Sequence, residues 1–288
     1  MKQLIKDLLA QIDYWLHLYG IRKNKIKVYT VDETIDELIN TEKSMVRFGD
    51  GEITVIRGRD LKLQKVNPEI SEGLKRILGY EYDDMIVTIP EIFGNMSMYR
   101  KKSRQFWKEH LLIYRKVYDR YCNPNRIYYN TSVSRFYYAF NNKEKCKLWA
   151  EKLKKIWGDK DIVVVEGQKT HNGVGNDLFD NAKTIERIIG PSSDAYEKRE
   201  EILDCCRKYE KDRLFLISLG VAAKFITECL FLEGYRVLDI GNLDLEYEWY
   251  IHGEKDKISL TKNAIIGEEE NKKAGYDIYL SQIKYQIL

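Results

Sequence analysis

The sequence has little that marks a membrane-spanning or secreted protein. Its longest apolar run, residues 214–226, is interrupted by Lys224 and is shorter than the roughly 20 residues that a spanning helix needs. Residues 1–20 mix charged and apolar residues at helical spacing and contain no small-residue cleavage site, so we expect no secretory signal. A cytoplasmic protein is expected, and peripheral association with a membrane stays open.

Cysteine and histidine are also scarce. The five cysteines are an odd number without CxxC spacing, which argues against a closed disulfide framework. His171 and His252 have no HxxxH or cysteine partner, so a zinc site is not indicated. No GxSxG motif occurs either, which leaves covalent hydrolysis without support.

The sequence also has no large excess of positive or negative charge. The net charge is +3, from 48 basic and 45 acidic residues, so the chain is not a polycation built for nucleic acid, and we expect no nucleic-acid partner. A chain of 288 residues is long enough for a sizeable core. We expect a helical extension over residues 1–25 and a single domain over residues 26–288.

Buried strands and helices alternate along the chain, which predicts an α/β fold with a mostly parallel, twisted, Rossmann-like sheet flanked by helices. The expected strands are residues 44–48, 83–90, 126–131, 161–167, 213–220 and 236–241. The expected helices are residues 1–20, 31–43, 70–79, 97–122, 142–157, 195–209 and 221–234, together with one after the glycine loop that carries Leu178, Ile185 and Ile188. Asp32 or Thr34 is the expected cap of the helix over residues 31–43.

Four polar segments follow predicted strands. They are Asp50/Glu52, Ser134/Arg135, residues 166–177 and Asp244/Glu246/Glu248. In a parallel sheet these segments converge on one edge, where ligands collect in open α/β folds. This convergence predicts a binding site there.

The stretch "RFGDGE" places Asp50 and Glu52 two residues apart between glycines. Carboxylates suit Mg²⁺ or Mn²⁺, which use one or two of them while substrate phosphates complete the coordination shell. A solvated Asp-Gly turn is the alternative interpretation.

The stretch "LDLEYE" spaces Asp244, Glu246 and Glu248 with a period of two. In a strand the three carboxylates would share one face and need a positive partner. An exposed edge strand with one polar face is the alternative.

A glycine loop follows the strand over residues 161–167. Gly167, Gly173 and Gly175 do not have GxGxxG spacing, and no Gly-Lys-Ser/Thr occurs, so neither a Rossmann cofactor site nor a P-loop is indicated. Backbone amides near Asn176, aided by Lys169, are still suited to a diphosphate. Arg47 and Arg135 are candidates for phosphate contacts or for pairing with nearby carboxylates.

Several stretches together resemble the GT-D-type bacterial glycosyltransferases, a family first described as a domain of unknown function. They are "RFGDGE", "SVSRFYYAF", "VVVEGQKTHNGVGNDLFDNAKTIERIIGP", "LISLGVAA" and "LDIGNLDLEYEWY". The resemblance covers residues 28–253 and implies a GT-D fold and metal-dependent transfer of a sugar, glucose in characterised members. The donor would be a UDP-sugar, and the acceptor a glycan on a cell-surface glycoprotein or polysaccharide.

The resemblance places a Mn²⁺ or Mg²⁺ ion on Asp50 and Glu52, with Asp244 and Glu246 as the rival placement. The residues expected to hold the donor are Arg47, Arg135, Glu166, Gly167, Lys169, Gly175, Asn176 and Asp177. Asp244, Glu246 or Glu248 would act as the catalytic base. A non-catalytic nucleotide-sugar or glycan-binding module is the alternative function, and a metal-dependent phosphohydrolase ranks last.

Overall fold

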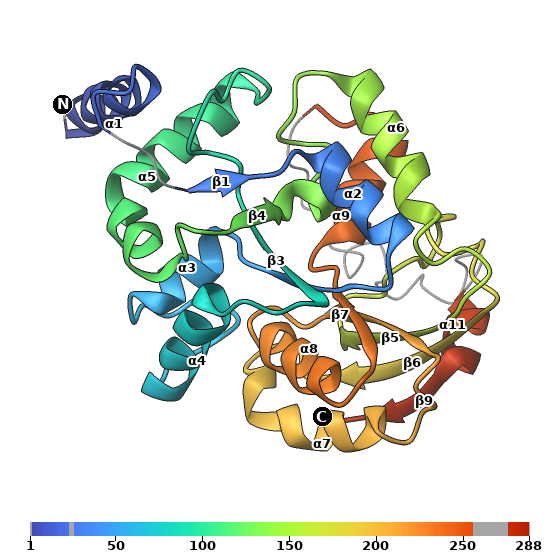
Figure 1. Ribbon diagram of the computed structural model, residues 1–288. Helices are drawn as coiled ribbons and strands as arrows, with labels where there is room; N and C mark the ends of the chain where they lie inside the picture. The colour runs from blue at the N-terminus through green and yellow to red at the C-terminus, as the bar shows by residue number, and fades with distance from the viewer. Residues whose placement is uncertain (1, 23–25, 256–275, 288) are drawn as a thin grey trace.

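A parallel β-sheet forms the centre of the protein, as a computed structural model that describes residues 2–22, 26–255 and 276–287 shows (Figure 1). Within these residues the sheet has nine strands in the order β1-β4-β3-β2-β8-β7-β5-β6-β9, and every neighbouring pair is parallel. The strands are β1 (Lys27–Val28), β2 (Ser44–Arg47), β3 (Met85–Ile89), β4 (Ile127–Asn130), β5 (Asp161–Gly167), β6 (Thr184–Gly190), β7 (Leu214–Ser218), β8 (Arg236–Asp239) and β9 (Ile283–Gln286). The expected α/β fold with a parallel sheet is confirmed.

Helices cover both faces of the sheet. The helices are α1 (Lys2–Leu18), α2 (Val31–Asn40), α3 (Asp50–Ile56), α4 (Pro68–Gly79), α5 (Lys101–Tyr121), α6 (Lys143–Lys154), α7 (Arg199–Cys206), α8 (Ala222–Leu232), α9 (Leu243–Ile251) and α11 (Tyr276–Gln282), with short 3₁₀ turns at Thr131–Ser134 and Ala195–Lys198. Helices α3, α4, α7 and α8 lie on one face, and α2, α6 and α9 lie on the other (Figure 1). None of the described helices is long and apolar enough to cross a membrane.

The central strands are apolar along their whole length because both of their faces are covered by helices. All five residues of β7 are buried, and Ile162 through Val165 of β5 have no exposed surface. Fully burying each such side chain contributes about 1.5–3 kcal/mol. The segments that follow the strands leave this buried sheet at its carboxyl edge.

The segment after the glycine loop is not the helix that the sequence predicts. Residues 168–183 form turns, and Thr184–Gly190 is strand β6, paired with β5 along all seven residues. The spacing of Leu178, Ile185 and Ile188 fits one helix. It also fits a buried loop residue, Leu178, followed by a strand that contains the β-branched residues Ile185 and Ile188. Tertiary pairing with β5 decides between them.

The acidic stretch after β8 is helix α9 and not a strand. In a helix Asp244 and Glu248 are four residues apart and share a face, whereas Glu246 projects elsewhere. The interpretation that all three carboxylates line one face is therefore wrong.

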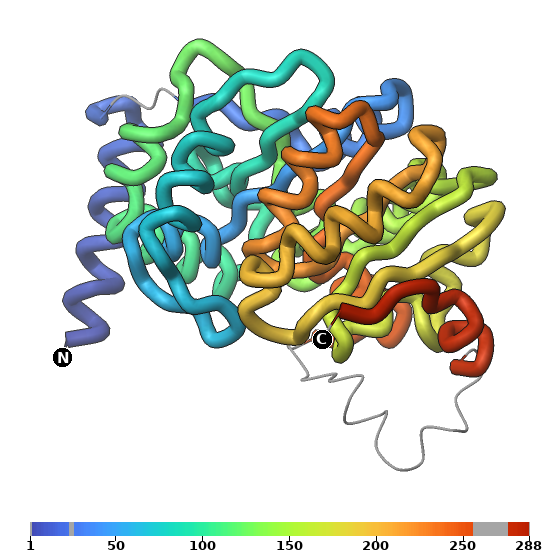
Figure 2. Tube along the Cα trace, turned by 90° about the horizontal axis from the view of Figure 1, so that it is seen from below, coloured from blue at the N-terminus to red at the C-terminus, as the bar shows by residue number. Residues whose placement is uncertain are grey.

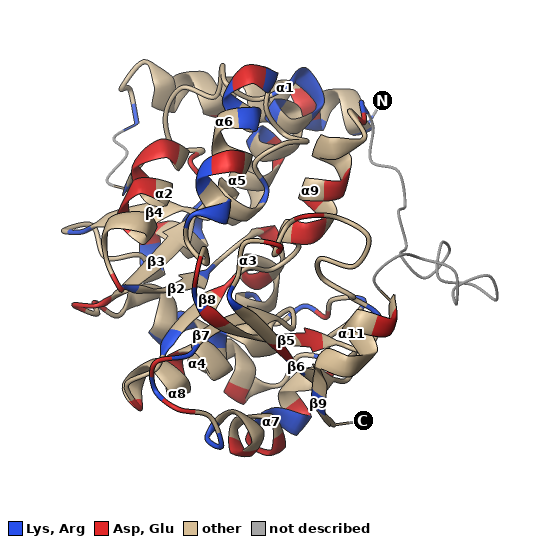
Figure 3. Ribbon diagram, turned by 90° about the vertical axis from the view of Figure 1, so that its right-hand side faces the viewer, with Lys and Arg blue, Asp and Glu red and all other residues tan. Residues whose placement is uncertain are grey.

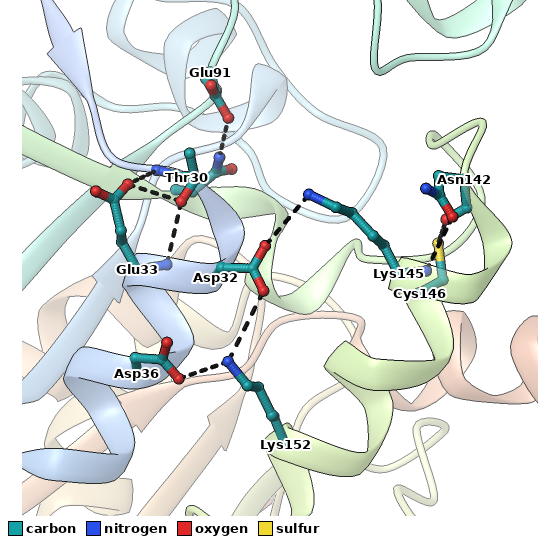
Figure 4. A network of polar contacts seen from close by, with 10 residues as sticks. Thr30, Asp32, Glu33, Asp36, Glu91, Asn142, Lys145, Cys146 and Lys152 are labelled. Carbon is teal, nitrogen blue, oxygen red and sulfur yellow. Dashed lines mark hydrogen bonds and ion pairs between the residues drawn. The ribbon is translucent and has the colours of Figure 1, made fainter.

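The cap of helix α2 is Thr30, two residues before Asp32 and four before Thr34. Thr30 accepts a hydrogen bond from the Glu33 amide, and the Glu33 carboxylate accepts from the Thr30 amide, which makes a capping box. Lys152 of α6 lies 2.8 Å from Asp36 and ties α2 to α6 (Figure 4). Neither Asp32 nor Thr34 is the cap.

Candidate functional site at the carboxyl edge of the sheet

Four charged side chains are packed together where β2 and β8 end. Lys224 of α8 lies 2.8 Å from Glu52 and 3.0 Å from Asp239. The backbone amide of Arg47 donates to Asp239 across 3.3 Å. Burial opposes ionisation of Glu52, but Lys224 and the Gly49 amide outweigh it and lower the pKa of the carboxyl. The pairing likewise raises the pKa of Lys224 against its burial, so both groups are charged.

Asp50 and Glu52 occupy the first turn of α3, directly after β2. Glu52 accepts a hydrogen bond from the Gly49 amide at 2.7 Å, as the third residue of a helix often does. Residues two apart on a helix point about 200° away from each other. Accordingly, Asp50 is exposed, while Glu52 turns inward to Lys224.

The Arg47 guanidinium reaches from β2 toward the end of β4. It donates to the Thr131 carbonyl at 3.3 Å. Its charge also interacts with those of Glu52, Glu246 and Arg135, so it links the start of α3 to α9. Gly241 makes room for it: a Cβ at that position would lie 1.9 Å from Arg47 Nη1.

Glu246 of α9 is held by the segment that follows β4. One of its oxygens accepts from the amides of Tyr137 and Tyr138, at 3.1 and 2.8 Å. The Arg135 guanidinium lies 3.8 Å from its other oxygen, and 38% of the Arg135 side chain is exposed. Two segments that are far apart in the sequence thus meet at this carboxylate.

Asp244 and Glu248 meet the glycine loop on the shared face of α9, whose acidic residues are red in Figure 3. The side-chain amide of Asn176 donates to Asp244 at 2.9 Å and to Glu248 at 2.5 Å. The Gly173 amide donates to Asp244 at 2.8 Å. His252 lies 3.3 Å from Glu248, whose side chain is 12% exposed.

The rest of the glycine loop is a mixture of buried and exposed groups. Glu166 is fully buried, and Arg187 and the Asn172 amide contact it at 2.6 and 2.7 Å. Burial raises the pKa of Glu166, although Arg187 opposes the change. By contrast Lys169 is exposed. Of the remaining predicted residues, Gly167 is buried at the end of β5, Gly175 has a φ of +78°, and Asp177 binds Lys154 and Tyr247.

Three of the four predicted segments therefore meet in two groups that α9 joins, and Glu52 of the fourth segment interacts with the first group through the charge of Arg47. One contains Arg47, Arg135 and Glu246, and the other contains Asn176, Asp244 and Glu248. A surface cavity lined by Ser44, Leu214 and Arg236 lies at the opposite edge, where the strands begin, away from these groups.

Comparison with known proteins identifies the family of this chain. The sequence model of the family described as "Glycosyltransferase GT-D fold" matches residues 45–268. The chain belongs to this GT-D family. It is also similar to a solved structure described as a new glycosyltransferase (DUF1792) from Streptococcus sanguinis, with 37% identity and a TM-score of 0.85 over 91% of this chain and 100% of that one. A second, described as a domain of unknown function 1792 with a distinct glycosyltransferase fold, shows 32% identity and the same TM-score over 100% of both chains.

Two curated relatives are longer than this GT-D chain. A probable glycosyl transferase Gly from Streptococcus gordonii is 39% identical over 256 residues, which are 88% of this chain and 37% of that protein. Glycosyltransferase GlyD from Streptococcus pneumoniae serotype 4 (strain ATCC BAA-334 / TIGR4) is 39% identical over 237 residues, which are 82% of this chain and 29% of that protein. The chain thus spans about a third of the length of these relatives.

Three charged residues at the carboxyl edge of the sheet were not predicted from the sequence. Lys224 pairs with Glu52 and Asp239, and Asp239 also accepts a hydrogen bond from the Arg47 backbone amide. Glu91, labelled in Figure 4, follows β3 and accepts a hydrogen bond from the Asn130 side chain, which the figure does not label, at 2.8 Å. Burial raises the pKa of Glu91 to about 7, although the Asn130 bond opposes the change. The rule that selects polar residues after buried strands would have found Glu91.

A divalent cation bound at this site would have few ligands from the protein. Among residues 2–22, 26–255 and 276–287, no three His, Cys, Asp or Glu side chains are grouped so as to hold a metal ion. Glu52 already has Lys224 and the Gly49 amide as partners. Mg²⁺ and Mn²⁺ sites in enzymes that act on phosphates often use a single carboxylate plus substrate oxygens. The exposed Asp50 carboxylate meets that requirement.

Proposed function

We propose that this GT-D chain transfers a sugar from a UDP-sugar to a hydroxyl group of a glycan acceptor, with UDP-glucose as the first donor to test. The acceptor would belong to a cell-surface glycoprotein or polysaccharide, and the reaction would take place in the cytoplasm. The observation that carries the proposal is that α9 joins two polar groups at the carboxyl edge of the sheet: Arg47 and Arg135 lie beside Glu246, and the glycine loop contacts Asp244 and Glu248.

Departure of the nucleoside diphosphate places negative charge on the β-phosphate, so the site needs positive groups that are already in position. Arg135 is the best placed of these, because it is partly exposed and lies beside Glu246. Lys169 is exposed on the glycine loop and would provide a second, more flexible contact. Arg47 is buried, and its role is to fix the end of β2 relative to the segment after β4.

Asp50 is the residue that we propose to hold Mn²⁺ or Mg²⁺, with substrate phosphate oxygens as further ligands. When bound, the ion neutralises charge that develops on the leaving diphosphate. Glu52 would orient the first turn of α3 through its bonds to the Gly49 amide and Lys224. Asp244 and Glu246 remain the rival placement, but on α9 they point in different directions and are each bound by protein donors.

A carboxylate must also take the proton of the acceptor hydroxyl if the reaction inverts the anomeric centre. Glu248 is the first of the three candidates to test, because 9% of the whole residue is exposed, compared with 4% for Asp244 and 2% for Glu246. Asn176 orients Glu248 by a hydrogen bond. Asp244 and Glu246 would position the glycine loop and Arg135.

The alternative is a module that binds a nucleotide-sugar or glycan without turnover. The observation that favours it is that each α9 carboxylate already has protein hydrogen-bond donors. Incubation with a panel of nucleotide sugars, with and without Mn²⁺, separates the two functions. Slow Mn²⁺-dependent release of UDP from one donor, accelerated by an acceptor glycan, supports the transferase. Saturable binding of UDP-sugar with no release of UDP supports the module.

A further inference from the structure

Helix α1 carries most of its large apolar residues on the side that faces away from the protein. Leu4, Ile5, Leu8, Ile12 and Trp15 follow helical spacing along one face, and between 41% and 73% of each is exposed. Figures 1 and 2 both show α1 at the periphery of the molecule, beside α5. A helix that packs on a core through its apolar face has the opposite orientation.

The side of α1 that packs against the protein carries the buried Ala10 and the partly buried Tyr14, and it makes several polar contacts. Lys6 pairs with Glu109 of α5, and Gln11 accepts from Lys108 of α5 at 2.6 Å. The buried Asp13 lies 2.8 Å from Arg22 and 3.6 Å from Arg115 of α5. These contacts fix the rotation of the helix about its axis. The apolar face is therefore held outward by specific polar contacts.

The helix pair α1 and α5 also concentrates positive charge. Helix α5 contains seven Lys or Arg residues and two acidic residues, a net charge of +5. Helix α1 contains two Lys and two Asp residues and is neutral. The pair thus carries +5 in a chain whose total is +3, so the other residues sum to −2. Lys101 and Lys116 of α5 are exposed.

We propose that the outer face of α1, with the basic residues of α5 beside it, docks on the surface of a membrane that contains anionic lipids. An amphipathic helix with Leu, Ile and Trp on its apolar side lies in the headgroup region, and neighbouring basic residues add attraction to anionic lipid. Charge decides between a membrane and a second copy of the chain. Pairing of two copies through α1 would bring two strongly positive α5 helices together, whereas anionic lipid complements them.

The docking face is one helix away from the candidate site. The opposite side of α5 contacts α3, where the Tyr114 hydroxyl lies 3.2 Å from the Thr54 hydroxyl, two residues after Glu52. Docking through α1 would therefore hold the carboxyl edge of the sheet at a defined position relative to the membrane surface. This inference does not depend on the proposed chemistry.

Co-sedimentation of the full chain with lipid vesicles tests the proposal. We expect binding to vesicles of about three parts phosphatidylcholine and one part phosphatidylglycerol, and much weaker binding to phosphatidylcholine alone. The double variant Leu8→Asp, Ile12→Asp is expected to reduce the bound fraction at least about tenfold without lowering the melting temperature, because both side chains are exposed. The matched control is Leu148→Asp, Leu232→Asp, which changes two leucines that are 57% and 68% exposed on α6 and α8. This control is expected to bind like the parent.

A second variant keeps the test independent of α1 folding. Lys101→Glu with Lys116→Glu leaves α1 unchanged and is expected to weaken binding to anionic vesicles several-fold. Equal binding by the parent and the Leu8→Asp, Ile12→Asp variant would overturn the proposal. A parent that ignores both kinds of vesicle but sediments as a dimer, which the same variant converts to a monomer, would overturn it in favour of a second copy.

Discussion

Lys224 lies 2.8 Å from Glu52, and only 4% and 12% of the two side chains are exposed. This contact assigns different tasks to the two carboxylates of "RFGDGE". Glu52 is committed to a buried cation of the protein itself, whereas Asp50, two residues earlier, is exposed. The two residues are therefore not equivalent: Glu52 is paired within the protein, and Asp50 is the carboxylate that we propose as the metal ligand.

Replacing Lys224 by methionine should destabilise the protein strongly. The variant leaves Glu52 and Asp239 buried without their shared cation, and breaking a buried pair in this way costs about 3–5 kcal/mol. Urea unfolding measures the loss. Lys198→Met is the matched control, because Lys198 pairs with Glu201 at the surface, where such a pair contributes about 1 kcal/mol or less. Equal stability of the two variants would contradict the buried pairing.

Replacing Gly241 by alanine should displace Arg47. Gly241 has a φ of +48°, and a Cβ there would lie 1.9 Å from Arg47 Nη1. Gly253→Ala is a matched control, because Gly253 has a φ of +64° but no atom within 4 Å of the added Cβ. Both variants bear the backbone cost of about 1 kcal/mol, so the melting temperature of Gly253→Ala should fall slightly. The melting temperature of Gly241→Ala should fall further, and only this variant should lose turnover. Similar losses in both variants would count against the role of Arg47.

Glu91 should make stability depend on pH. Its pKa is raised by burial from 4.5 to about 7. The folded protein therefore keeps a proton that the unfolded chain releases between these values, so this group contributes less stability as the pH rises through the window. After allowance for partial exposure, the loss amounts to about 1–2 kcal/mol.

Urea unfolding of the parent and of Glu91→Gln at pH 4.5 and at pH 7.5 measures this effect. The parent should lose stability relative to the variant over that interval. Glu81→Gln, which changes an exposed residue, should follow the parent. A parent and a Glu91→Gln variant with parallel pH profiles would show that Glu91 titrates normally.

The core strands can be predicted from the sequence because burial on both faces leaves long apolar runs. Strands β5 and β7 illustrate this, and their parallel pairing follows from the helices between strands. The region of β6 cannot be predicted in the same way, because its partner β5 decides between helix and strand. Helix α9 lacks an apolar stripe altogether, since it buries acidic and aromatic residues on several sides.

The candidate site is predictable as a set of segments but not as a set of contacts. The strand-end rule selects Asp50, Arg135 and the acidic residues of α9. It does not find Lys224, because a lysine within an apolar run is read as an interruption of the run. In the structure the same lysine is the buried partner of Glu52. Which carboxylate is exposed and which is paired is a property of three-dimensional packing.

The most direct test of the account is Mn²⁺-dependent release of UDP from a UDP-sugar by Asp50→Asn. If Asp50 holds the ion, this isosteric change should reduce release at least about 100-fold while the melting temperature stays within a few degrees of the parent. Asp212→Asn, an exposed aspartate at the opposite edge of the sheet, is the matched control and should retain full activity. Parental activity in Asp50→Asn, or release by the parent that is unchanged in excess EDTA, would contradict the account.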